Sequence, residues 1–299
     1  MRAMSTKAPE TIRIGDLEVN RMGYGAMRLP GEHVWGEPRD PDEARAVLRR
    51  AVALGVNLID TSWYYGPYVA DRLIVEALHP YPKGLVLATK LGGKRLPDKS
   101  WAPDMQPAAL KAAHDAELKA LRLDCADIVH LRWIGSDVPF ADALGAFIDM
   151  KAAGKIRHIA LSNVSLAQLD EALRTTPIVG VQNIYNVAHR TGGGIGPMHH
   201  ADNPEAVLAR CEEKGLVFMP FFPLMMGSLG KKENAALAAA AGTHKATQAQ
   251  IALAWLLARS KAMLPIPGTS SVKHLEENWA AQDISLTSDE VGAIAKAAG

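Results

Sequence analysis

The sequence alternates repeatedly between short apolar segments and longer segments with helical periodicity. We expect strands near residues 22–26, 57–60, 85–89, 126–131, 156–161, 179–182, 216–219 and 263–266, and helices near residues 41–55, 69–78, 107–121, 141–153, 166–174, 204–214, 247–259 and 272–281. A repeated strand–helix order is typical of a parallel sheet with helices packed outside it. Eight such units fit an α/β protein of the (β/α)₈ TIM-barrel type, which usually has about 250 residues. We predict a single domain over residues 1–299.

Residues 11–21 precede the first unit and have the pattern of a β-hairpin. Two short alternating segments flank Gly15 and Asp16, a common turn dipeptide. We expect this hairpin to cap the barrel. A doubly wound sheet is the alternative fold, but it normally carries a Gly-x-Gly-x-x-Gly turn after its first strand. Residues 23–28 lack the third glycine of that turn.

The charge balance limits the classes of partner. The chain has 33 Lys and Arg against 32 Asp and Glu, and its formal net charge is +1. No overall field therefore favours nucleic acid or an anionic membrane. No run of about 18 apolar residues could span a bilayer, and the N-terminal segment lacks the apolar stretch of a secretion signal. We expect a cytoplasmic protein that binds neither nucleic acid nor membrane; the residues do not determine its oligomeric state.

Four polar residues stand where predicted strands end or in the loop just beyond. They are Asp60, Tyr65, Lys90 and His130. The carboxyl ends of parallel barrel strands meet at one rim, so we expect these four side chains to converge there. A carboxylate, a phenol, an ammonium and an imidazole can together run proton transfer to a carbonyl group.

Five ordered segments carry a likeness to a known family. Residues 55–66, 89–90, 154–163, 181–186 and 266–278 resemble the corresponding motifs of the aldo-keto reductase family. The likeness extends over nearly the whole chain. It implies the barrel fold and NADPH-dependent reduction of a carbonyl compound, with NADH as a possible substitute.

The resemblance also implies a role for each of the four polar residues. Carbonyl reduction needs a hydride donor, which no side chain provides, and a proton donor for the oxygen. Tyr65 would give the proton, helped by a nearby Lys90 ammonium that favours the phenolate, and Asp60 would keep Lys90 charged. His130 would donate a hydrogen bond to the carbonyl oxygen. Residues 131–133, which follow it, depart from the family's common continuation.

The cofactor site is implied in the same way. Ser162, Asn163 and Gln182 would bind the nicotinamide carboxamide, and Phe221 would stack on the ring where the family usually has tyrosine. The helix start after Gly268 would bind a phosphate at the adenosine end. The full expected set is Gly25, Ala26, Met27, Asp60, Ser162, Asn163, Gln182, Phe221, Pro223, Leu224, Gly268, Ser270, Ser271, Lys273, Glu277 and Asn278. We expect no metal.

The expected 2′-phosphate site favours NADPH over NADH. Ser270, Ser271 and Lys273 offer two hydroxyl groups and a cation. Reductases with a strong NADPH preference often have Lys and Arg where this chain has Gly268 and His274, so phosphate discrimination is expected to be weaker here.

The substrate pocket is expected in the loops of the catalytic rim. Its candidate residues are Trp35, Trp63, Tyr64, Trp133 and Arg190, with the long segment 186–203 beside them. Aromatic side chains there favour a flat or apolar carbonyl compound. Residues 23–27, 185–190 and 220–224 look most like bacterial reductases of the pyridoxal-reducing kind, which implies an aromatic aldehyde as substrate.

Two other functions use the same features. Some relatives use this barrel as a nicotinamide-binding partner subunit that couples redox state to another protein, with little turnover. A barrel isomerase or lyase could use Lys90 as a Schiff-base nucleophile and would need no NADPH. The intact set of four polar residues favours the carbonyl reductase.

Overall fold

A parallel sheet forms the centre of the molecule. The computed structural model describes residues 10–191, 203–225 and 234–297. The sheet has the order β11-β10-β9-β8-β5-β4-β3. Its strands are β3 (Tyr24–Gly25), β4 (Leu58–Asp60), β5 (Val86–Leu91), β8 (Ala126–Arg132), β9 (Ile156–Ser162), β10 (Ile178–Gln182) and β11 (Val217–Phe218). Each of the predicted strands 1 to 7 therefore lies within one or two residues of an observed one.

The segment after α8 closes the sheet into a barrel. Leu264 N donates to Phe218 O at 2.9 Å on one side, and Gly23 N donates to Pro265 O at 2.9 Å on the other. Residues 263–267 thus lie between β11 and β3, where the eighth strand was predicted. Pro265 and Pro267 have no N–H group to donate, so the segment makes too few ladder bonds to be a regular strand. The predicted eight-unit barrel is confirmed.

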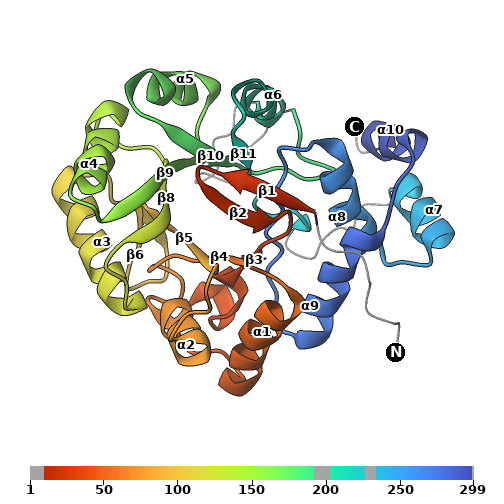
Figure 1. The fold of residues 1–299 in the computed structure, drawn as a ribbon, viewed down its shortest axis with the longest axis horizontal. Helices are drawn as coiled ribbons and strands as arrows, with labels where there is room; N and C mark the ends of the chain where they lie inside the picture. The colour runs from red at the N-terminus through yellow and green to blue at the C-terminus, as the bar shows by residue number, and fades with distance from the viewer. Residues whose placement is uncertain (1–9, 192–202, 226–233, 298–299) are drawn as a thin grey trace.

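Helices surround the sheet on its outer face (Figure 1). They are α1 (Pro41–Leu54), α2 (Val69–Leu78), α3 (Pro107–Leu121), α4 (Phe140–Ala152), α5 (Leu166–Thr175), α6 (Pro204–Lys214), α8 (Gln248–Arg259) and α9 (Val272–Trp279). Their ends follow from local chemistry. Ser165 and Gln168 form a capping box at α5, as Thr247 and Gln250 do at α8. The eight predicted helices correspond to these, and α2, α3 and α6 have the predicted bounds.

The hairpin of β1 (Thr11–Ile14) and β2 (Leu17–Asn20) covers the centre of the barrel (Figure 1). Ile14 and Val19 are fully buried in the apolar cluster that fills the barrel interior. Gly15 turns with φ of +62°, a conformation that favours glycine. Asp16 beside it binds Arg157 Nη2 at 2.7 Å and His158 Nε2 at 2.5 Å. The predicted cap is confirmed, and it closes the end of the barrel opposite to the carboxyl ends of the strands.

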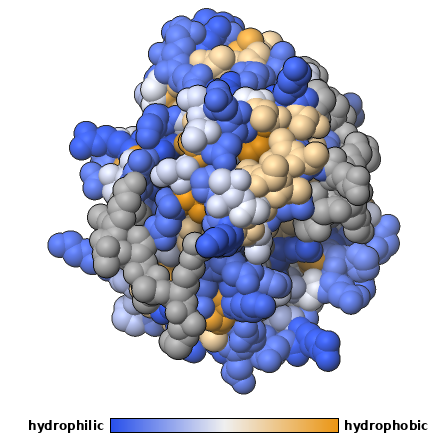
Figure 2. Space-filling view, turned by 90° about the vertical axis from the view of Figure 1, so that its right-hand side faces the viewer, coloured by the Kyte–Doolittle hydropathy of each residue, from blue (hydrophilic) through white to orange (hydrophobic). Residues whose placement is uncertain are grey.

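Several elements were not predicted. They are the hairpin β6 (Gly93–Arg95) and β7 (Trp101–Pro103), the helices α7 (Ala235–His244) and α10 (Ser288–Ala297), and the short 3₁₀ turns η1 (Ala26–Arg28), η2 (Glu32–Val34) and η4 (Ala280–Asp283). The alanine-rich sequence of α7 has no apolar periodicity, which explains the omission. Figure 2 faces the side of α7 and α10, where hydrophilic residues surround a limited apolar area. Among the described residues, no helix is both long and apolar enough to cross a membrane.

Candidate active site

A buried ion pair lies at the rim formed by the ends of β4 and β5. Lys90 Nζ is 2.7 Å from Asp60 Oδ2 and 2.9 Å from Thr61 O. Lys90 is 1% exposed and Asp60 is 3% exposed. Two charges buried this deeply are stable only as a well-oriented pair with further hydrogen bonds. The structure therefore brings Asp60 and Lys90 together as predicted.

The second oxygen of Asp60 binds Gln182 at the end of β10. Gln182 Nε2 donates to Asp60 Oδ1 at 2.7 Å, and Gln182 is 1% exposed. Asp60 thus orients both a lysine and an amide through its two oxygens. The amide oxygen of Gln182 remains available to a polar ligand at the rim.

Tyr65 lies directly beside Lys90. Lys90 Nζ is 5.0 Å from the centroid of the Tyr65 ring, and Tyr65 is 6% exposed. Burial raises the pKa of Tyr65 above its ordinary value, and the charge of Asp60 raises it further, while Arg132 lowers it. This direction is opposite to the one expected from Lys90, because desolvation of the phenolate outweighs the nearby cations. Tyr65 is therefore a protonated phenol at neutral pH, the form that a proton donor requires.

His130 lies in the barrel interior in register with Lys90. It is fully buried, and its Nδ1 is 3.1 Å from Thr89 O. A carbonyl oxygen only accepts, so Nδ1 carries the hydrogen. Burial lowers the pKa of His130 to about 4, so the ring is neutral and Nε2 is an acceptor. The predicted donation from His130 to a carbonyl oxygen does not fit this tautomer.

Arg132 is a rim residue that the sequence analysis passed over. It ends β8, two residues after His130. Its Nη1 is 3.2 Å from Ser162 Oγ, and its Cζ is 5.3 Å from the centroid of the Phe221 ring. Side chains two residues apart on a strand share one face, and this alternation was the signal that could have found it.

The predicted nicotinamide residues lie beside Arg132. Ser162 and Asn163 are fully buried at the end of β9, and Asn163 Nδ2 donates to Trp133 O at 2.5 Å. Phe221 is 8% exposed and pairs with Ile184 at the end of β10. Pro223 and Leu224 follow in the same loop. Hydroxyl, amide and aromatic groups at neighbouring strand ends form a donor set that suits a carboxamide-bearing ring.

The predicted adenosine end begins where two backbones touch. A Cβ on Gly268 would lie 2.5 Å from Gly25 O, and one on Gly25 would lie 2.7 Å from Ile266 O. Only glycine fits such an approach. Ala26 beside Gly25 is fully buried, and Met27 is partly buried. These residues join the end of β3 to the loop that leads into α9.

The first turn of α9 differs from the expected phosphate site in one respect. Val272 N donates to Glu43 Oε1 of α1 at 3.0 Å, so a carboxylate already binds an N-terminal amide of this helix. The side chain of Lys273 is 80% exposed, and its Nζ is 3.8 Å from Glu277 Oε1. Ser270 is exposed, Ser271 is the N-cap residue, and Asn278 is 7% exposed.

Comparisons with known proteins identify the family of this chain. Residues 21–298 match the model of the aldo/keto reductase family. The chain belongs to this family. It is 43% identical over 291 residues to pyridoxine 4-dehydrogenase of Escherichia coli strain K12, covering 95% of this chain and 96% of that protein. It is 40% identical over 287 residues to an uncharacterized oxidoreductase of Schizosaccharomyces pombe, covering 96% and 89%.

Solved structures of other aldo/keto reductases have the same fold. The thermostable aldo-keto reductase Tm1743, crystallised with the inhibitor epalrestat, has a TM-score of 0.81 at 28% identity, covering 96% of this chain and 98% of that one. An aldo/keto reductase from Klebsiella pneumoniae in complex with NADP and acetate has a TM-score of 0.76 at 25% identity, covering 97% and 95%.

The predicted substrate residues of this aldo/keto reductase are divided between rim and core. Trp35, Trp63 and Trp133 are partly exposed, whereas Tyr64 is 1% exposed and packs in an apolar cluster. Arg190 Nη2 donates to Ala295 O at 2.5 Å, so this side chain holds α10 in place. Residues 192–202, which make up most of the predicted loop 186–203, lie outside the described residues.

Two further acids are buried beneath the reductase site. Asp71 accepts from Thr61 Oγ1 at 2.7 Å, and Glu117 accepts from Thr89 Oγ1 and, at 2.7 Å, from Trp63 N. Burial raises the pKa of both carboxyl groups, and the charge of Asp71 raises that of Glu117 further. Within the described chain, Asp71 Oδ2 and Glu117 Oε2 are buried without a hydrogen-bond partner. In both residues burial thus shifts the equilibrium from the carboxylate toward the protonated carboxyl group.

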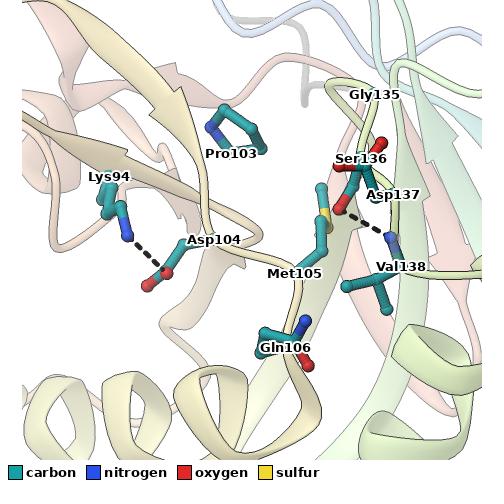
Figure 3. Close-up of a pocket in the computed structure, with 9 residues that line it drawn as sticks. All are labelled: Lys94, Pro103, Asp104, Met105, Gln106, Gly135, Ser136, Asp137 and Val138. Carbon is teal, nitrogen blue, oxygen red and sulfur yellow. Dashed lines mark hydrogen bonds and ion pairs between the residues drawn. The ribbon is translucent and has the colours of Figure 1, made fainter.

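A separate surface cleft of about 500 Å³ lies between the β6–β7 hairpin and the loop after β8 (Figure 3). It is lined by Lys94, Pro103, Asp104, Met105, Gln106, Gly135, Ser136, Asp137 and Val138. Lys94 Nζ binds Asp104 Oδ1 there at 2.9 Å. The residues that line this cleft include none of the four predicted catalytic residues.

Proposed function

We propose that this protein is a carbonyl reductase that uses NADPH, and in its absence NADH, to reduce an aromatic aldehyde. The observation that carries this proposal is the buried Asp60–Lys90 pair with the Tyr65 ring 5.0 Å from the ammonium. A protonated phenol beside an ammonium is a proton donor at a site that accepts a developing negative charge.

The cofactor proposal rests on the polar groups around the ion pair. Ser162, Asn163 and Gln182 would hold the carboxamide, Phe221 would stack on the ring, and the loop from Gly268 would hold the phosphates. The bound nicotinamide supplies the hydride. Two structures of Klebsiella pneumoniae aldo/keto reductases are complexes with NADP and with NADPH, which supports the same choice here.

The proton transfer follows from the chain's own residues. When hydride adds to the carbonyl carbon, the C=O π pair moves to oxygen, and Tyr65 Oη gives that oxygen its proton. Lys90 then stabilises the phenolate that is left behind. Asp60 keeps Lys90 charged and fixed in position throughout. The phenol is restored by a proton from solvent, and the products are an alcohol and the oxidised cofactor.

The substrate proposal rests on the rim and on one relative. Trp35, Trp63 and Trp133 offer partly exposed aromatic surface near the site. The 43% identical Escherichia coli protein is named pyridoxine 4-dehydrogenase, and that name denotes oxidation of an aromatic alcohol, the reverse of aldehyde reduction. An aldehyde of the pyridoxal type is therefore our proposed substrate class.

The arrangement of Lys90 argues against the isomerase or lyase alternative. Its Nζ donates hydrogen bonds to Asp60 Oδ2 at 2.7 Å and to Thr61 O at 2.9 Å, so the group is already engaged as a donor in two directions. A Schiff-base nucleophile needs a neutral amine with a free lone pair. Lys90 is oriented as a cation.

A single assay tests the proposed function. Purified protein is mixed with NADPH and a panel of aldehydes that includes pyridoxal and benzaldehyde, and the loss of reduced-nicotinamide absorbance is followed. We expect oxidation of NADPH that depends on both protein and aldehyde, with alcohol formed in equal amount. Tight NADPH binding with no turnover on the whole panel would instead favour the partner-subunit function.

A further inference from the structure

The side chain of Arg132 lies at the end of β8, with its Nη1 3.2 Å from Ser162 Oγ. We infer that Arg132, and not His130, donates the charged hydrogen bond to the substrate carbonyl oxygen during reduction. This inference rests on the proposed function and assigns a further catalytic residue to it.

The parity of β8 places Arg132 inside the barrel. Ile128 belongs to the apolar cluster of the barrel interior, whereas Val129 and Leu131 belong to the outer cluster beneath the helices. Successive side chains of a strand alternate between faces, so His130 and Arg132 point inward with Ile128. Arg132 is the last residue of the strand and is partly exposed, so it is the member of this row nearest to the mouth.

The neighbours of Arg132 define its place relative to a bound cofactor. Its Nη1 reaches Ser162 Oγ at 3.2 Å, and its Cζ is 5.3 Å from the Phe221 ring centroid. These are the residues assigned to the carboxamide and to ring stacking. A nicotinamide held by these two residues would therefore lie close to the guanidinium. The guanidinium is also close enough to Tyr65 to lower the pKa of that phenol.

His130 is unsuited to the same task. Its Nδ1 hydrogen is donated to Thr89 O at 3.1 Å and burial lowers the pKa of the ring, so Nε2 carries a lone pair and can only accept a hydrogen bond. Two acceptors repel each other. A guanidinium stays protonated at every working pH and has several N–H groups, so Arg132 can bind Ser162 and a substrate oxygen at once.

Charge balance favours a cation at this position. Asp60 and Lys90 neutralise each other, and the carbonyl oxygen gains negative charge as hydride arrives. A fixed donor aimed at developing charge is worth about 10² to 10³ in rate, as deletion of such donors in other enzymes shows. The charge on Arg132 also favours anionic ligands, so a carboxylate that mimics the charged oxygen should bind beside it.

The test uses Arg132→Ala, Arg132→Lys and His130→Asn in the full-length chain. We measure kcat/KM for benzaldehyde, NADPH affinity by fluorescence, and benzoate affinity for the NADP⁺ complex by calorimetry. Arg132→Ala should lower kcat/KM by about 10² or more and weaken benzoate at least about tenfold. Its NADPH affinity should stay within about threefold. Added guanidinium ion should restore part of the turnover of Arg132→Ala. The kcat/KM of Arg132→Lys should lie between those of the parent protein and Arg132→Ala. His130→Asn should keep at least about a tenth of kcat/KM.

The outcomes of this test distinguish a failure of the Arg132 assignment from a failure of the proposed function. Turnover and benzoate affinity in Arg132→Ala within about threefold of the parent would overturn the assignment, as would a loss in His130→Asn equal to that in Arg132→Ala. If the variant misfolds, Arg132→Lys carries the test, because it keeps the stem and a charge but loses the planar fork. Failure of the parent protein to oxidise NADPH with any aldehyde would refute the proposed function, and this inference with it. An active parent with an active Arg132→Ala refutes the inference alone.

Discussion

Lys90 Nζ lies 2.7 Å from Asp60 Oδ2 in a part of the barrel where both residues are at least 97% buried. Neither charge has access to bulk water, so each depends on the other. Removing Lys90 leaves a buried carboxylate that keeps the hydrogen bond from Gln182 but has lost its countercharge. Both the stability of this region and its proposed chemistry therefore depend on the Asp60–Lys90 ion pair.

This dependence predicts a strong coupling in stability. Lys90→Met should lower the free energy of unfolding by about 3–5 kcal/mol, the usual cost of breaking a buried pair from one side. The double variant Asp60→Asn/Lys90→Met should lose less than Lys90→Met alone, because no uncompensated charge remains. Urea titration of the parent, the two single variants and the double variant gives the coupling energy. Additive losses would show that the two residues do not depend on each other.

Tyr65 should be required for the proton and not for the cofactor. Tyr65→Phe removes only the hydroxyl, so turnover should fall by about 10² to 10⁴ while NADPH affinity is unchanged. Tyr64→Phe is the matched control, because Tyr64 is a core residue next to it in sequence. Steady-state kinetics and fluorescence titration separate the two effects. Turnover above about one per cent in Tyr65→Phe would mean that another group donates the proton.

Reduction should not require an acidic medium. Burial lowers the pKa of His130 to about 4; Asp60 and the Thr89 carbonyl raise it, and Lys90 and Arg132 lower it. A reaction that needed the imidazolium would lose about tenfold in rate for each pH unit above that value. With Arg132 as the donor, kcat should instead be nearly flat between about pH 6 and about pH 8. A steep decline across that range in the pH–rate profile would restore the donor role to His130.

The buried acid Asp71 should lower stability as pH rises. Burial raises its pKa to about 6 in the folded protein, against about 4 in the unfolded chain. Below about pH 4 both states are protonated, so ionisation of Asp71 has no effect on stability. Between about pH 4 and about pH 6 the unfolded chain releases the proton that the folded state keeps, so the free energy of unfolding falls, and the loss is complete above about pH 6. Asp71→Asn should therefore raise the free energy of unfolding by about 1–3 kcal/mol at pH 8, and by less at pH 5.

Thermal unfolding at several pH values measures this effect. Asp42→Asn provides the control, since the Asp42 side chain is 94% exposed on α1. A gain for Asp71→Asn that is the same at both pH values would point to packing and not to ionisation.

Glu43 should oppose the 2′-phosphate of NADPH. Its carboxylate binds Val272 N at 3.0 Å, on the helix end assigned to that phosphate. Glu43→Gln keeps the acceptor oxygen and removes the charge, so the NADPH:NADH affinity ratio should rise a few-fold, in line with about 0.3–1 kcal/mol for one charge at a helix end. Lys273→Ala should lower the same ratio. Fluorescence titration of both variants with NADPH and with NADH measures this ratio. An NADPH:NADH affinity ratio that is unchanged in both variants would mean that the 2′-phosphate binds elsewhere.

The sequence by itself was sufficient to predict the order of the elements and the proximity of Asp60, Lys90 and Tyr65. Strand and helix periods are local properties, so α2, α3 and α6 were predicted to the residue. Asp60 and Lys90 could be selected because they stand at the ends of predicted strands, and Tyr65 because it stands in the loop after the first of these strands. The family motifs added the expected roles of these residues, because the motifs can be recognised in the sequence without knowledge of the fold.

The tertiary structure decided what depends on burial and on neighbours distant in sequence. Whether residues 263–267 close the barrel depends on hydrogen bonds to β3 and β11 that no local pattern contains. Nε2 of His130 is an acceptor because the Nδ1 hydrogen is donated to Thr89 O. Arg132 lies near the mouth of the barrel because it points inward, as Ile128 and His130 do, and is the last residue of β8. The pKa of Tyr65 rose because desolvation outweighs charge in a packed interior. Solvent exclusion and donor geometry arise only when the whole barrel has formed.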